Sequence, residues 1–288
     1  MDFGRLVSAM VTPFHADGSI DLDTTGRLMD YLIQDQQNDS IVVCGTTGES
    51  PTVSDEEKEA LFTFAVKHAA GRCKIIAGTG SNDTAHSIHL TRIAQQCGVD
   101  AVLLVAPYYN KPTQEGMYQH FKAIAESTTL PVILYNVPGR TIVSLSAATT
   151  LRLAQLPNVV ATKECASLDQ VAEIVREAPD NFRVYSGDDS SALPALAVGA
   201  YGIVSVASHV IGKEMKAMIH AYLDGNNGEA AKLHGESLRV FKGLFDLPNP
   251  VLVKAALALK RLPVGGVRLP LVDANEAEID VLKQLLNG

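Results

Sequence analysis

The feature that most constrains how this chain can fold is a set of short apolar runs that recur through its first 210 residues. Each run is almost continuously apolar and rich in β-branched residues, and stretches with helical spacing separate one run from the next. Continuous runs, in contrast to alternating ones, are typical of parallel strands buried on both faces. The predicted strands are residues 6–14, 40–48, 74–80, 101–109, 131–138, 159–165, 182–189 and 202–210.

The segments between these runs carry the signals of helices. Ser54 with Glu57 has the spacing of a capping box, and so has Ser167 with Gln170. Because parallel neighbours must be joined by crossovers, we expect a strand followed by a helix about eight times. Further helical segments are predicted at residues 59–70, 113–127 and 146–155, with Gly71 and Gly98 where two helices should end.

Eight such units within roughly 210 residues favour a closed (β/α)8 barrel, the TIM barrel, over an open sheet. No GxGxxG follows the first strand, which argues against a dinucleotide-binding Rossmann fold. We therefore predict an α/β protein with a barrel core over residues 1–211 and C-terminal helices over residues 212–288, packed on the barrel or used for assembly. The helices of this extension are expected at residues 213–223, 228–245, 250–260 and 274–287.

Composition argues against several classes of function. The 288 residues carry a formal net charge of −8 without any Lys/Arg run, so nucleic acid is not expected as a partner. Residues 190–212 lack Asp, Glu, Lys and Arg, but Pro194 and His209 favour a short buried helix, a turn and a buried strand over a membrane span. The four cysteines form no CxxC and the start lacks a secretory pattern, so we expect a cytoplasmic protein with free thiols.

In (β/α)8 barrels the functional groups gather at the carboxyl ends of the strands. Several polar residues are predicted there, and they come from six of the eight strands. They are residues 45–49, 108–110, Tyr135, Asn136, Arg140, Lys163, Glu164, residues 187–189, Ser205 and Ser208.

Lys163 is the least expected of these residues, because it lies in an apolar run where an ammonium group is costly unless it is paired or loses its proton. It is either a strand-end lysine that extends to water or pairs with a carboxylate, or a neutral amine that forms a Schiff base with a carbonyl. Tyr135 is predicted at matching depth on the preceding strand. It is either a core tyrosine or a phenol that transfers protons.

Two further positions have the chemistry to hold carboxylates. Thr46 and Thr47 lie between glycines, in a turn that either is ordinary or presents N–H groups and hydroxyls to a small carboxylate. Arg140 follows a predicted strand and is either a solvated arginine or a bidentate ligand for a second carboxylate. His86 and His89 are three apart on a predicted helix, but no third ligand is evident, so no metal site is predicted.

Five segments occur together and in this order: GTTGESPT (45–52), APYYNKPTQEGMYQHF (106–121), LYNVPGRT (134–141), ATKE (161–164) and SGDDSSAL (186–193). In combination they resemble the dihydrodipicolinate synthase family. That family belongs, with N-acetylneuraminate lyase, to the pyruvate-dependent class I aldolases that work through a Schiff base. The resemblance covers essentially the whole chain, including residues 248–257.

The resemblance implies a role for each matching residue. Lys163 would form the Schiff base with pyruvate, and Tyr135 would donate and accept protons. Thr46 and Tyr109 would complete a proton relay. In this family the tyrosine that matches Tyr109 reaches in from a neighbouring subunit. The resemblance therefore implies a homo-oligomer, either a tetramer or a dimer.

The remaining roles concern substrate binding. Thr47 would bind the pyruvate carboxylate, Val204 and Gly187 would line the pocket, and Arg140 would bind the carboxylate of the aldehyde substrate. The implied reaction condenses pyruvate with L-aspartate 4-semialdehyde to 4-hydroxy-tetrahydrodipicolinate, the committed step of diaminopimelate and lysine biosynthesis. No metal or organic cofactor is implied, because the covalent imine on Lys163 is itself the electron sink.

Two alternatives remain at this point. One is another pyruvate-dependent class I aldolase, of the N-acetylneuraminate or 2-keto-3-deoxygluconate type, which would share Lys163 and Tyr135 but should lack Arg140. The other is a barrel without catalytic activity that binds a metabolite.

One departure from the family pattern bears on regulation. Lysine-inhibited bacterial members use a histidine where this chain has Lys58 and a glutamate where it has His86, whereas Ser50, Asn82 and Tyr108 are retained. A cation at position 58 and a lost carboxylate at position 86 should both disfavour a bound ammonium group. We therefore expect weak or absent inhibition by lysine.

Overall fold

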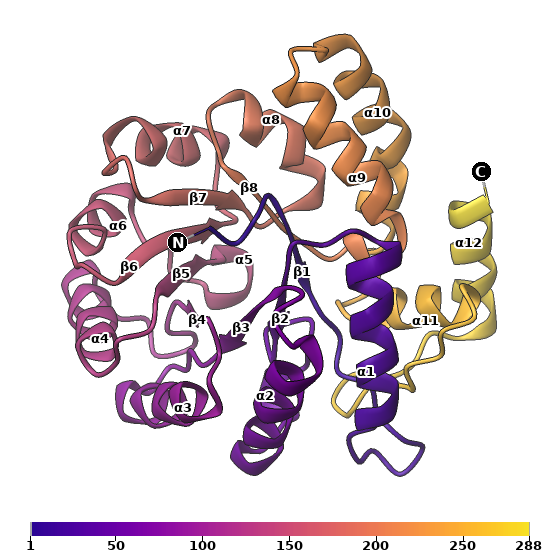
Figure 1. Cartoon of the computed structure of the whole chain (residues 1–288), viewed down its shortest axis with the longest axis horizontal. Helices are drawn as coiled ribbons and strands as arrows, with labels where there is room; N and C mark the ends of the chain where they lie inside the picture. Colours follow the sequence, from indigo (N-terminus) through magenta and orange to yellow (C-terminus); the bar gives the residue numbers. More distant parts are fainter. Residues whose placement is uncertain (1, 288) are drawn as a thin grey trace.

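Eight parallel strands close into one barrel in chain order, and β1 pairs with both β2 and β8 (Figure 1). The structure, a computed structural model, describes residues 2–287. The predicted (β/α)8 fold is confirmed. The strands are β1 (Leu6–Ala9), β2 (Ser40–Val43), β3 (Lys74–Gly78), β4 (Ala101–Val105), β5 (Val132–Asn136), β6 (Val159–Glu164), β7 (Arg183–Ser186) and β8 (Gly202–Ser205).

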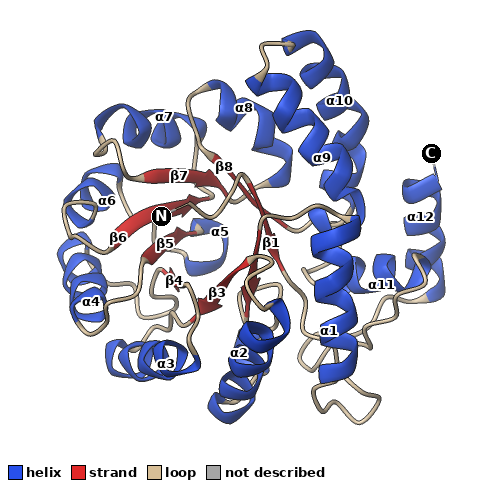
Figure 2. Cartoon of the chain, in the orientation of Figure 1, coloured by secondary structure: helices blue, strands red, loops and turns tan. Residues whose placement is uncertain are grey.

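Helices surround the strands on the outside of the barrel (Figure 2). The helices that lie between strands are α1 (Leu22–Asp30), α2 (Asp55–Ala69), α3 (Thr84–Cys97), α4 (Gln114–Glu126), α5 (Pro138–Thr141), α6 (Ala147–Leu153), α7 (Leu168–Glu177) and α8 (Ala192–Ala197). Those that follow β8 are α9 (Ser208–Leu223), α10 (Asn227–Gly243), α11 (Val251–Leu259) and α12 (Glu276–Asn287). Short helical turns also occur at Tyr31–Asp35, Ser50–Thr52 and Asp189–Ser191.

The observed strands are shorter than the predicted runs, because most of the runs continue into the loops at the carboxyl ends. Residues 44–48, for example, leave β2 where Cys44 takes a positive φ of 56°. The loops are apolar enough to resemble strands in the sequence because they too are buried, as the exposed fractions of Cys44 (1%) and Thr47 (2%) show. The polar site residues therefore lie on loops as well as on strand ends.

Local capping explains where the helices begin. Ser54 accepts from the backbone N–H of Glu57 at 3.2 Å, and Glu57 Oε2 accepts from Ser54 N at 2.9 Å, which completes the predicted capping box of α2. The second predicted box is only half formed. Ser167 caps α7 by accepting from Gln170 N at 3.2 Å, but the side chain of Gln170 turns away toward Glu164 and Leu145.

The barrel interior is filled by alternate residues of the strands, as the period of two requires. Apolar side chains occupy most of these positions, among them Val42, Ile133 and Ala161. Lys163 is two residues beyond Ala161 and so shares its inward face, whereas Glu164 points outward to the helices. The sequence thus places one lysine among apolar neighbours inside the barrel.

The C-terminal helices pack on one side of the barrel (Figure 1). Residues 192–205 form α8, a turn and β8, as predicted, but the strand predicted over residues 202–210 ends at Ser205, and residues 208–212 already belong to α9. Residues 206–210 resemble a strand in the sequence because they are mostly apolar and are buried at the start of that helix. No helix within residues 2–287 is long and apolar enough to cross a membrane. The predicted division between residues 211 and 212 falls inside α9, beside Ile211, whose backbone is non-helical. That division stays a prediction, because a local kink does not define a domain boundary.

Candidate active site

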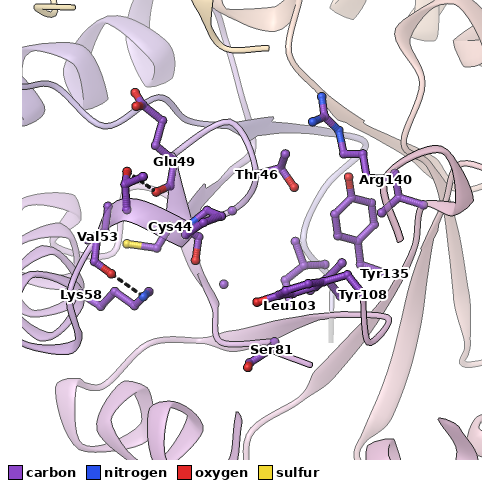
Figure 3. Close-up of a pocket in the computed structure, with 18 of the residues that line it drawn as sticks. Cys44, Thr46, Glu49, Val53, Lys58, Ser81, Leu103, Tyr108, Tyr135 and Arg140 are labelled. Carbon is purple, nitrogen blue, oxygen red and sulfur yellow. Dashed lines mark hydrogen bonds between the residues drawn. The ribbon is translucent and has the colours of Figure 1, made fainter. Parts of the chain in front are cut away.

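A cavity of about 550 Å³ opens at the carboxyl ends of the strands, where the sequence predicts the functional groups. The loops after β2, β3, β4 and β5 contribute to it, together with the segment between α10 and α12. Figure 3 shows Thr46, Tyr135 and Arg140 on one side of this cavity and Lys58 on the other.

Lys163 and Tyr135 lie side by side at the base of this region. The β5–β6 ladder pairs the two residues directly, and Lys163 Nζ lies 4.2 Å from the centroid of the Tyr135 ring. Each residue is only 5% exposed. No carboxylate oxygen of residues 2–287 lies within 4.0 Å of Lys163 Nζ. The lysine is therefore neither extended into water nor part of a salt bridge. Its Nζ instead lies over the face of the Tyr135 ring, the geometry of a cation–π contact.

Gly187 provides the space that the lysine side chain occupies. A Cβ at this position would lie 2.8 Å from Lys163 Cε and 2.3 Å from Cys165 Sγ, both closer than van der Waals contact allows. Val204 contributes to the same apolar interior as Tyr135 and is 2% exposed. Gly187, Val204 and Lys163 thus lie around the base of the site and not on the wall of the open cavity.

The two threonines of the β2 loop lie in different environments. Thr46 lines the cavity, whereas Thr47 is buried and its Oγ1 accepts a hydrogen bond from Asn249 Nδ2 at 2.9 Å. Asn249 is 6% exposed, and its Oδ1 has no partner among the described residues. Sequence reasoning gave Asn249 no role, although it lies between two prolines in the segment 248–257 that the resemblance covers.

A buried ion pair fastens the same loop to the C-terminal segment. Lys254 Nζ lies 2.6 Å from Glu49 Oε1, and both side chains are almost fully buried. Burial lowers the pKa of Lys254, although Glu49 acts in the opposite direction. Glu49 Oε2 also accepts from Arg268 N at 2.9 Å. The loop therefore has fixed contacts with residues more than 200 positions away in the sequence.

Arg140 lies on the short helix α5, which begins at Pro138, a favourable first residue for a helix. It is exposed and lines the cavity (Figure 3). No Asp or Glu of residues 2–287 pairs with its guanidinium. This arginine can therefore accept a carboxylate from a ligand.

Tyr109 is the one predicted site residue that the single chain places neither on the cavity wall nor at the buried base beside it. Its side chain is 86% exposed and its backbone has a positive φ of 72°. The neighbouring Tyr108 lines the cavity instead. The loop is fixed by Asn82, which donates to Tyr108 O at 3.1 Å and accepts from Asn110 Nδ2 at 2.9 Å.

The far side of the cavity contains Lys58 and His86, the two residues on which the prediction about lysine rests. Lys58 is 5% exposed and donates to the carbonyl of Val53 at 2.6 Å. Asp55 lies 4.0 Å from Lys58 Nζ and 3.0 Å from His86 Nε2, and His89 is 3.7 Å away. The described residues include no group of three His, Cys, Asp or Glu that could hold a metal ion.

Comparison with known proteins gives one consistent result. The model of the dihydrodipicolinate synthetase family matches residues 2–288. The 4-hydroxy-tetrahydrodipicolinate synthases of Bacillus velezensis and Bacillus subtilis are each 56% identical to this chain, over 279 and 280 residues, with 96% of both chains covered in each case. A crystal structure of dihydrodipicolinate synthase DapA-2 from Bacillus anthracis has a TM-score of 0.98 and 54% identity and covers 100% of this chain and 99% of its own. The lysine-bound enzyme of Cyanidioschyzon merolae has a TM-score of 0.96 and 43% identity, with 99% of this chain and 97% of its own covered.

Proposed function

Because this chain belongs to the dihydrodipicolinate synthetase family, we propose that it condenses pyruvate with L-aspartate 4-semialdehyde to 4-hydroxy-tetrahydrodipicolinate. It is an enzyme of the lyase class, and the reaction belongs to diaminopimelate and lysine biosynthesis. The observation that carries the proposal is the pair of Lys163 and Tyr135, buried side by side below a cavity that also presents Arg140.

The first step is imine formation. The amine of Lys163 attacks the C2 carbonyl of pyruvate, and the carbinolamine loses water to give the imine. Tyr135 supplies a proton to the departing hydroxyl and takes protons from the nitrogen, a role supported by its ring lying against the lysine. Thr46, on the cavity wall, passes protons to and from this phenol. No metal or organic cofactor takes part, because the imine withdraws electrons from the pyruvate carbon skeleton.

The second step forms the carbon–carbon bond. Loss of a proton from C3 converts the imine to an enamine, whose C3 attacks the aldehyde carbon of the second substrate. The amino group of that substrate then attacks the imine carbon, which closes the ring and releases the Lys163 amine. Arg140 holds the carboxylate of the aldehyde substrate, as its unpaired position at the cavity supports.

Binding of pyruvate uses the base of the site. Thr47 binds the pyruvate carboxylate, with its hydroxyl oriented by Asn249. Gly187 and Val204 line the space around the methyl and keto groups, since Gly187 lies against Lys163 and Val204 belongs to the same apolar cluster as Tyr135. The arginine argues against a sugar-acid aldolase, whose acceptor presents hydroxyls and not a second carboxylate.

The proton relay is completed by a second copy of the chain. Tyr109 reaches the site of a neighbouring subunit in a homo-oligomer, either a tetramer or a dimer. Its 86% exposure and left-handed backbone support this, because an aromatic residue held outward in such a conformation needs a partner surface. We also propose that this enzyme acts in the cytoplasm, a compartment that its free cysteines favour.

Mass spectrometry of the product from pyruvate and L-aspartate 4-semialdehyde tests the proposal. We expect 4-hydroxy-tetrahydrodipicolinate from the native enzyme and a loss of several orders of magnitude in Lys163→Ala, with an exposed lysine variant, Lys232→Ala, as the control. No product from folded native protein would reject the acceptor. Borohydride would then show whether pyruvate still becomes attached to Lys163, as it would in another aldolase, or whether the barrel only binds a metabolite.

A further inference from the structure

Glu164, the last residue of β6, is a buried carboxylate without an assigned role. It directly follows Lys163 and is 2% exposed. Because successive side chains of a strand point to opposite faces, the lysine points into the barrel and Glu164 points outward, toward the surrounding helices. No Lys, Arg or His nitrogen of the described chain lies within 4.0 Å of its carboxylate.

Three N–H groups take the place of a counter-ion. Glu164 Oε1 accepts from Asn136 Nδ2 at 2.9 Å and from Ala166 N at 2.7 Å, and Oε2 accepts from Gln170 Nε2 at 3.0 Å. The carbonyl of Leu145 closes a ring, since it accepts from Asn136 Nδ2 at 3.1 Å and from Gln170 Nε2 at 2.8 Å. We call Asn136, Glu164, Gln170 and the Leu145 carbonyl the carboxylate ring.

The carboxylate ring joins the elements that carry the proposed site residues. The β5–β6 ladder pairs Tyr135 with Lys163 and, one position later, Asn136 with Glu164. Leu145 ends the loop that follows α5, the helix with the cavity arginine, and the backbone N–H of Leu145 also donates to Asn136 Oδ1 at 2.9 Å. Each strand end of the reactive pair therefore has one member of the ring immediately after it.

We propose that Glu164 is a positioning residue, whose carboxylate holds the ends of β5 and β6 and the loop after α5 at the spacing that brings Tyr135 against Lys163 during the reaction. The inference rests on the proposed function. An acceptor is needed at both oxygens, because all three incoming groups are N–H donors. Burial raises the pKa of Glu164 to about 7, and the same donors act to lower it. They therefore favour the ionised form on which the ring depends.

The test replaces one carboxylate oxygen of Glu164 with an NH₂ group. In Glu164→Gln an NH₂ group replaces one oxygen and meets a donor from Gln170 or from Asn136, so one link of the ring breaks while the volume is kept. Because small displacements of reacting groups are costly, we expect kcat to fall by about 10-fold or more, with a much smaller change in the KM for pyruvate. Glu173→Gln, the same change on the exposed face of α7, should behave as the native enzyme.

A swap of the two side chains separates positioning from general destabilisation. In Glu164→Gln with Gln170→Glu, a donor again faces an acceptor between positions 164 and 170, but the Leu145 carbonyl loses its donor from position 170, so we expect recovery of only part of the lost kcat. Unchanged kcat in Glu164→Gln, or a loss that the swap does not recover, would overturn the proposal. If Glu164→Gln does not fold, Gln170→Met serves, since it removes the two hydrogen bonds that Gln170 donates to the ring and leaves the carboxylate in place. We expect kcat to fall there too, and an unchanged kcat would equally overturn the proposal.

The proposed function is scored separately in the same experiment. The native enzyme alone decides whether 4-hydroxy-tetrahydrodipicolinate forms. The ratio of the variant rate to the native rate decides the role of the carboxylate ring. This ratio is measured twice, once for kcat and once for the rate at which borohydride fixes pyruvate on Lys163. A native enzyme that fixes pyruvate without forming this product would reject the proposed aldehyde, and the trapping ratio would still confirm or overturn the positioning role.

Discussion

Asn249 donates a hydrogen bond to the hydroxyl of Thr47 over 2.9 Å, although 202 positions of sequence separate the two residues. The C-terminal extension, which a bare (β/α)8 barrel does not need, therefore touches the loop proposed to bind pyruvate. The buried pair of Lys254 and Glu49 fastens the same loop at a second point. We infer that the extension is part of the active site's support and not only a surface for assembly.

The hydrogen bond leads to a prediction for pyruvate binding. In Asn249→Ala the Thr47 hydroxyl loses the donor that orients it, so we expect the KM for pyruvate to rise about 10-fold, the equivalent of about 1.4 kcal/mol for one hydrogen bond. The kcat should change less. Steady-state kinetics with Asn227→Ala, an exposed asparagine of α10, as the control provide the measurement. An unchanged KM would show that Thr47 is oriented without Asn249.

A second prediction concerns the space beside the reactive lysine. In Gly187→Ala the new Cβ would meet Lys163 Cε at 2.8 Å, so the lysine must move, and we expect kcat to fall by about 100-fold. Borohydride trapping of pyruvate should slow in parallel. Gly235→Ala, where a Cβ on α10 meets nothing within 4 Å, is the matched control and should keep full activity. Full activity in Gly187→Ala would mean that the lysine has room that the structure does not show.

The sequence predicted the barrel because its signals are local. Continuous apolar strands and the cap at Ser54 need only neighbouring residues, and the structure confirms them. The pairing of Lys163 with Tyr135 could also be predicted, because equal depth on adjacent parallel strands follows from the strand order. The contact of Asn249 with Thr47 could not be predicted, since it depends on how the C-terminal extension folds back over the barrel.

The carboxylate ring was missed for a different reason. The spacing of Ser167 and Gln170 predicted a reciprocal capping box, but Gln170 bonds to Glu164 and Leu145 instead. A buried carboxylate without a cation attracts any available donor more strongly than an exposed helix end does. Local motif rules do not include that competition, because the acceptor lies on the strand before the helix.

A third prediction addresses regulation. We expect L-lysine to inhibit this enzyme weakly or not at all, because the Lys58 ammonium lines that part of the cavity and Asp55 is already engaged by His86. Initial rates over a range of lysine concentrations provide the measurement. Strong inhibition at sub-millimolar lysine, abolished by Asn82→Ala, would contradict the expectation. The variant Lys58→His with His86→Glu, which introduces the residues expected of lysine-inhibited members, should become more sensitive to lysine than the native enzyme.

A fourth prediction concerns acid stability at the seam between β1 and β8. His209 is fully buried, its Nε2 accepts from Val11 N at 3.2 Å, and its Nδ1 lies 2.8 Å from the Val206 carbonyl. Burial lowers the pKa of His209 to about 4, so below its unfolded pKa of 6.5 the unfolded chain binds more protons than the folded one. Stability from this group is therefore present above pH 6.5 and is lost as the pH falls toward 4.

Urea unfolding at pH 7 and pH 5, at one fixed protein concentration, measures this effect. The loss between the two pH values should be about 2 kcal/mol smaller in His209→Gln than in the native protein, because glutamine keeps a donor and an acceptor but does not titrate. His220→Gln, an exposed histidine of α9, should lose as much as the native protein. Glu164, whose pKa is raised to about 7, acts in the opposite direction, so only the comparison between variants isolates the histidine. Equal losses in all three proteins would show that His209 does not remain neutral in the fold.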